Sequence, residues 1–89
     1  MEGYIGDVLL WAPSFVPRNW MACEGQLLPI NQHQALFSLL GTQYGGNGQT
    51  TFALPDMRDP GNPGYHKGFG PGQPVKYIIC IMGIYPSRW

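Results

Sequence analysis

Charged side chains are scarce in this sequence: Asp, Glu, Lys and Arg make up 11% of its 89 residues, against about 25% in ordinary soluble domains. Five basic and five acidic side chains cancel to a net charge of zero, and the basic ones are scattered. Nucleic-acid binding requires clustered Lys and Arg that neutralise phosphates, so nucleic acid is excluded as a partner. Zero net charge also removes the repulsion between molecules, which favours association with copies of the same chain or with a larger particle.

Long apolar runs are also missing. None approaches the roughly 18 consecutive residues of a membrane helix, so we expect no membrane insertion. The opening residues Met1 to Tyr4 contain no basic region, and the apolar run from Val8 to Ala12 is too short for the core of a signal peptide. We therefore expect that the chain has no signal peptide and that it assembles in the cytoplasm.

Cysteine is rare, because only Cys23 and Cys80 are present. Two cysteines do not make a disulfide framework. Both lie in apolar, strand-like contexts, where a free cysteine is usually buried. We expect two buried thiols, with a Cys23–Cys80 disulfide as the main alternative.

Glycine and proline are abundant, with 13 and 9 residues, but so are apolar residues, which make up 44% of the chain. That share is enough to form a core, so the glycines and prolines indicate turns rather than disorder. We expect a single domain over residues 1–89, with Trp11, Trp20 and Phe37 in its core.

The apolar pattern predicts an α+β fold with a small, mainly antiparallel sheet, one short helix and long Gly/Pro-rich loops. The helix is expected over Gln32–Leu40, because apolar residues recur there at helical spacing between a possible N-cap at Asn31 and Gly41.

Strands are expected near both ends of the chain, over residues 5–11 and 75–85. We expect them to pair antiparallel in the middle of the sheet, with the helix across one face and the first strand covered on both faces. Residues 20–23 and 26–28 are expected to form a hairpin around Glu24-Gly25, with a positive φ at the glycine.

No arrangement of residues indicates catalysis. The sequence has no Gly-x-Ser-x-Gly elbow, and Asp56 after Pro55 is typical of a turn residue that binds nearby amides. The glycines from Gly41 to Gly48 lack the Gly-Lys-Ser/Thr ending of a phosphate-binding loop. We expect no enzyme activity and no cofactor.

Several motifs occur in the order found in a known family. They are Trp20-x-x-Cys23-Glu24-Gly25-Gln26, Ala35 to Thr42, Tyr44-Gly45-Gly46, Thr51-Phe52-x-Leu54-Pro55-Asp56, and Gly83 to Arg88. With them the chain resembles the phage tail collar domain family, which is found at tail-fibre tips and in small tail-fibre proteins. The chain departs from the family after Asp56, because the long variable region of many members is reduced here to about residues 59–74.

The resemblance implies a structural and adhesive component of a phage tail fibre or phage-derived particle. The resemblance also implies that such a virion component assembles as a homo-oligomer, with a trimer favoured. Its expected partners are other particle proteins and glycans of the host cell surface. A self-assembling module without a receptor is the alternative, and a glycan-acting fibre-tip enzyme is a weak third.

Some fibre-tip proteins similar to this family carry a Gly-x-His-x-His motif that holds a metal on the trimer axis. The nearest match here is Gly64-Tyr65-His66-Lys67-Gly68, in which Gly68 replaces the second histidine. Three copies of His66 still provide three nitrogen ligands, but a single histidine beside a lysine is more often exposed to solvent. We therefore expect no metal site.

The expected contact surface consists of two loops, Tyr44–Thr50 and Asp59–Pro74, because binding residues are often found on loops held by a rigid scaffold. Aromatic faces can stack on sugars or fill pockets, and polar groups can form hydrogen bonds. The candidate binding residues are Tyr44, Asn47, Tyr65, His66 and Phe69. For Tyr44 and Phe69, burial in the core or in a subunit interface is an equal alternative.

Overall fold

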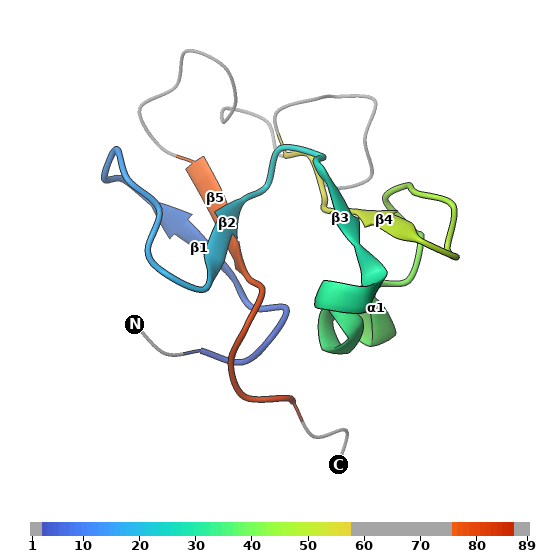
Figure 1. The fold of residues 1–89 in the computed structure, drawn as a ribbon. Coiled ribbons are helices and arrows are strands. Elements are labelled where there is room, and N and C mark those ends of the chain that lie inside the picture. The colour runs from blue at the N-terminus through green and yellow to red at the C-terminus, as the bar shows by residue number, and fades with distance from the viewer. Residues whose placement is uncertain (1–2, 58–75, 87–89) are drawn as a thin grey trace.

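The computed structural model describes residues 3–57 and 76–86 (Figure 1). In chain order, its elements are β1 (Val8–Trp11), β2 (Trp20–Ala22), β3 (Leu27–Pro29), the 3₁₀ helix η1 (Ile30–Gln32), α1 (Gln34–Leu40), β4 (Thr51–Ala53) and β5 (Lys76–Cys80). Strands β1, β5 and β2 form one sheet in that order, and β3 and β4 form a second. Both sheets are antiparallel, which confirms the α+β class. The Gly/Pro-rich segment 59–74 lies outside the described residues.

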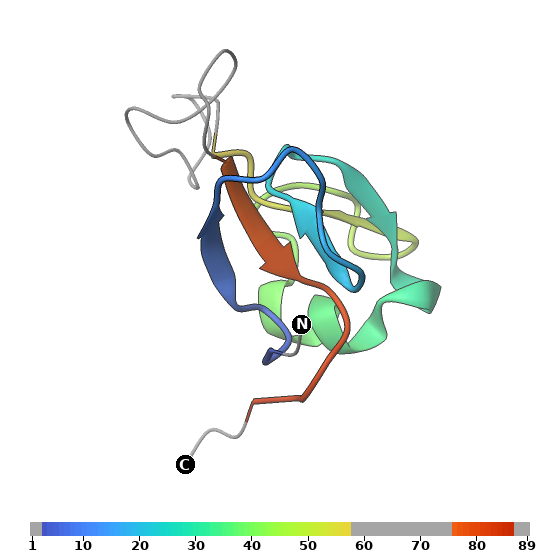
Figure 2. The ribbon, with the colours of Figure 1, turned by 90° about the vertical axis from the view of Figure 1, so that its left-hand side faces the viewer.

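The predicted pairing of the two ends of the chain is confirmed. Strand β5 lies between β1 and β2 (Figures 1 and 2), with Val8 opposite Ile79 and Trp20 opposite Cys80. The strand predicted over residues 75–85 is shorter in the structure, because regular pairing ends at Cys80 and a single parallel bridge joins Ile84 to Tyr4.

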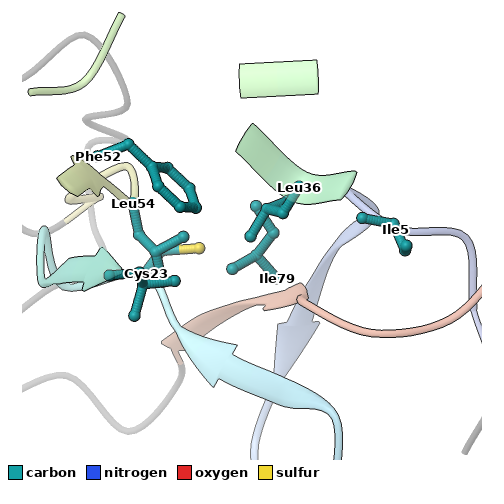
Figure 3. Packing of buried hydrophobic residues seen from close by; sticks show 7 residues of the cluster. Ile5, Cys23, Leu36, Phe52, Leu54 and Ile79 are labelled. Atoms are coloured by element: carbon teal, nitrogen blue, oxygen red, sulfur yellow. The ribbon is translucent and has the colours of Figure 1, made fainter. Parts of the chain in front are cut away.

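Successive residues of β5 point to opposite faces of the sheet. On one face, Ile79 packs in the main core, where the side chain of Leu36 from α1 lies beside it (Figure 3). The other buried members of this cluster are Ile5, Cys23, Leu28, Phe52 and Leu54. On the opposite face, Ile78 and Cys80 pack with Trp20 in a smaller cluster.

The two cysteines therefore belong to different clusters, and both are buried free thiols. Trp20 is a core residue, as predicted. Trp11 and Phe37 are half-buried and pack against the edges of the two clusters.

The predicted hairpin around Glu24-Gly25 is wrong. Strand β2 pairs with β5, whereas β3 pairs with β4, so the two segments belong to different sheets. Gly25 does have a positive φ of 76°, but its turn carries the chain from one sheet to the other. The Gln26 side chain donates from Nε2 to the Ala22 carbonyl at 3.0 Å, where a neighbouring strand would otherwise bind.

The helix begins later than predicted. Asn31 lies within η1, and the N-cap of α1 is His33, whose side chain makes no capping hydrogen bond. The end of the helix is as predicted, since Gly41 has a φ of 60° and its N–H donates to the Phe37 carbonyl at 2.8 Å.

Strand β1 is not covered on both faces, which corrects the prediction for the first strand. Val8, Leu9 and Leu10 are 37%, 39% and 52% exposed and belong to neither core cluster. The two core clusters form over β5 and β2, and β1 lies on the side of β5 away from β2, so these three side chains extend beyond both clusters.

Candidate functional site

The predicted contact loop Tyr44–Thr50 connects the end of α1 to β4. Its path depends on glycines with positive φ values, at Gly45, Gly46 and Gly48. A Cβ atom at Gly46 would collide with the Cα of Phe52 and lie 2.7 Å from the carbonyl oxygen of Thr51. The loop therefore lies directly against the backbone of β4.

The Asn47 side chain holds this loop together. Its Oδ1 accepts hydrogen bonds from the main-chain N–H groups of Gln49, Thr50 and Thr51 at 2.8, 2.9 and 3.1 Å. Its Nδ2 donates to Oγ1 of Thr50 at 3.0 Å. A short polar side chain that binds the following amides is typical of a turn-forming asparagine. The result is a surface loop with a defined shape.

Two of the five candidate binding residues lie within the described part of the chain, and both are in this loop. Asn47 is exposed and Tyr44 is half-buried. Tyr65, His66 and Phe69 lie outside the described residues, so the grouping of all five into one surface stays a prediction.

Sequence reasoning missed a second group of exposed apolar residues near the termini. Tyr4, Met82, Ile84 and Tyr85 are each at least half exposed. The hydroxyl groups of Tyr85 and Ser38 lie 2.7 Å apart, which ties this segment to α1. The apolar pattern of residues 81–85 resembles that of a buried strand, so nothing in the sequence distinguished these exposed side chains from core ones.

The titratable groups of the described residues include no activated nucleophile. Burial, followed by the nearby charges of Asp56 and Glu24, raises the pKa of the Cys23 thiol to about 12. Burial also raises the pKa of Cys80 and lowers that of His33. A thiol reacts as its thiolate, so both cysteines are held in their unreactive form.

Within residues 3–57 and 76–86, no cluster of three or more His, Cys, Asp or Glu side chains is arranged to hold a metal. His66, the candidate metal ligand, lies outside these ranges. No helix in the same ranges has the length and apolar character needed to cross a membrane.

Comparison with known families agrees with this architecture. The profile of the phage tail collar domain matches residues 6–60. The match spans more than half of the chain, from just before β1 to just beyond β4, and the chain belongs to this family. No curated protein and no solved structure was found to match it.

Membership of this family defines the class of protein. The collar domain is a structural domain of phage tail fibres and is not a known enzyme family. Such a domain is a component of a virion. The match ends before β5, although β5 completes the three-stranded sheet and supplies Ile79 to the core.

Proposed function

We propose that this chain is a structural and adhesive component of a phage tail fibre or phage-derived particle. It assembles as a homo-oligomer, for which the family resemblance favours three chains, joins other particle proteins, and contacts the surface of the host cell. The observation that carries the proposal is the collar-domain match over residues 6–60.

The proposed contact surface combines the loop Tyr44–Thr50 with residues 59–74. The hydrogen bonds of Asn47 support this assignment, because a loop with a fixed shape loses less conformational entropy on binding. In this surface, Tyr44, Tyr65 and Phe69 would supply aromatic faces for a glycan or a protein pocket, while Asn47 and His66 would supply polar groups.

Alanine substitution tests this surface. We expect Tyr65→Ala or Phe69→Ala to weaken attachment to host cells by about 1–2 kcal/mol or more, with the melting temperature unchanged. Tyr44→Ala tests the described loop in the same way. Lower melting temperatures with unchanged attachment would place these aromatics in the core instead.

A self-assembling module without a receptor is the second candidate. The exposed apolar side chains of β1 and of residues 82–85 favour it, because an interface between copies would remove them from water. Binding of the purified chain to an array of cell-surface glycans separates the two candidates: specific binding supports adhesion, and none supports assembly alone.

A further inference from the structure

The edge of β1 carries main-chain groups that have no partner within residues 3–57 and 76–86. Bonds along an antiparallel pair alternate in direction, and the bond from the Cys80 N–H to the Asp7 carbonyl at 2.9 Å sets this alternation. Leu9 accordingly directs its N–H and C=O toward β5, whereas Val8 and Leu10 direct theirs away from the sheet. Among the described residues, nothing donates to or accepts from these outward groups of Val8 and Leu10.

The other sheet edges in the described part of the chain are at least partly closed. On β2, the Trp20 N–H donates to the Pro17 carbonyl at 3.2 Å, and the Ala22 carbonyl accepts from Gln26. On β3, Pro29 has no N–H to offer, and proline is a common means of blocking an edge strand.

The loop Tyr44–Thr50 provides hydrogen-bond partners for the outer edge of β4. The Ala53 N–H donates to the Gly45 carbonyl at 3.1 Å, and the Thr51 carbonyl accepts from the Gly48 N–H at 3.0 Å. Strand β1 thus differs from the other edge strands: it contains no proline or charge, and its apolar side chains are exposed. No described residue pairs with its outer edge.

We propose that β1 binds β1 of a second copy of this chain, antiparallel and about a two-fold axis at Leu9. In this register Val8 of each chain lies opposite Leu10 of the other, so both sets of outward groups form hydrogen bonds. A register centred on Val8 would pair only the outward groups of Val8 within the two strands, and one centred on Leu10 only those of Leu10. The edge is therefore complementary to itself, which is the requirement for a two-fold interface.

The charges near β1 are compatible with this pairing. Asp7, the nearest charged residue, would lie opposite Trp11 of the second copy rather than opposite its own counterpart. Its Oδ2 atom already accepts from the Tyr4 N–H at 3.0 Å. The zero net charge of the chain adds no general repulsion between copies.

This inference rests on the proposed homo-oligomer and names one of its interfaces. A two-fold contact joins chains in pairs, so it predicts an even number of chains. If another surface forms trimers, β1 pairing joins two trimers into a particle of six chains.

The substitution Leu9→Cys tests the axis directly. Residues opposite each other in a non-hydrogen-bonded pair have Cα atoms about 4.5 Å apart, which is within the range that a disulfide spans. We expect mild oxidation to cross-link the full chain through residue 9. Leu27→Cys is the matched control, since Leu27 is 60% exposed on β3 and should not cross-link. Cys23 and Cys80 are buried in every variant.

Two further substitutions disturb the edge without introducing a thiol. Leu10→Lys places a charge on the interface, and Leu10→Pro removes one outward N–H. Each should weaken self-association by about tenfold or more, as expected when two symmetry-related side-chain pairs are lost. Leu27→Lys should leave self-association unchanged, and circular dichroism establishes that each variant is folded.

The outcomes separate this inference from the proposed function. An oligomer that forms but neither cross-links through residue 9 nor responds to either Leu10 substitution would overturn the β1 interface and leave the proposed assembly intact. A wild-type chain that stays monomeric would overturn both.

Discussion

Asn47 shows how one side chain determines the shape of the candidate contact loop. Its carboxamide oxygen accepts three main-chain hydrogen bonds, and each such bond contributes about 0.5–1.5 kcal/mol net. We expect Asn47→Ala to lower the free energy of unfolding by about 1.5 kcal/mol or more, measured by urea denaturation.

Asn47→Asp is the matched control, because it keeps the accepting oxygen, replaces the Nδ2 donor with a second oxygen and adds a negative charge. It should retain most of the stability. Equal losses in both variants would contradict the role assigned to the oxygen. A loss of attachment with unchanged stability in Asn47→Ala would show that Asn47 acts mainly as a contact residue.

We expect His33 to make the stability of the fold depend on pH. Its Nδ1 atom is buried without a hydrogen-bond partner among the described residues, and burial lowers its pKa below 6.5. The unfolded chain therefore binds a proton at higher pH than the folded chain does, so stability falls as pH drops below 6.5.

The comparison of His33→Asn with the wild type isolates this effect, because the other histidine of the chain, His66, is present in both. Between about pH 7.5 and pH 5.5, the wild type should lose more stability than the variant. Parallel pH profiles for the two proteins would show that His33 does not contribute.

At the scale of elements, the close approach of the loop to β4 explains why residue 46 is glycine. Both Gly41 and Gly46 have a positive φ, but an added Cβ at Gly41 has no atom within 4 Å, whereas at Gly46 it meets the Phe52 backbone. Gly41→Ala should cost about 1–3 kcal/mol from the backbone conformation alone, because φ 60° with ψ −144° lies in a region that is essentially restricted to glycine.

Gly46→Ala should cost about 2 kcal/mol more than Gly41→Ala, because β4 must also move. Thermal unfolding of both variants measures the difference. Equal melting temperatures would mean that the loop does not pack against β4.

The sequence predicted those elements whose signal is local or strongly apolar. The helix around Leu36, the turn at Gly41 and the pairing of the two ends were all expected. The partners of β2 and β3 were not, because a glycine with positive φ at residue 25 suits both a hairpin and a turn between two sheets. Only the long-range pairing of β3 with β4 distinguishes these possibilities.

The exposure of β1 was also beyond prediction, for a physical reason. The sequence of an apolar run such as Val8-Leu9-Leu10 does not indicate whether the run is covered by its own chain or by a second copy. For the site, the sequence identified the loop containing Tyr44 and Asn47 but not the bonds of the Asn47 side chain, which depend on the folded turn.

At the scale of the whole molecule, the central claim is that this collar-domain chain functions as part of an assembly. Zero net charge, apolar side chains exposed on β1 and an open strand edge all support association.

Sedimentation velocity of the purified wild-type chain at micromolar concentration tests this claim most directly. We expect an oligomer whose mass is a multiple of 9.9 kDa, the mass of one chain. Pairing through β1 makes that multiple even, and pairing of two trimers makes it six. A stable monomer of 9.9 kDa under these conditions would contradict it.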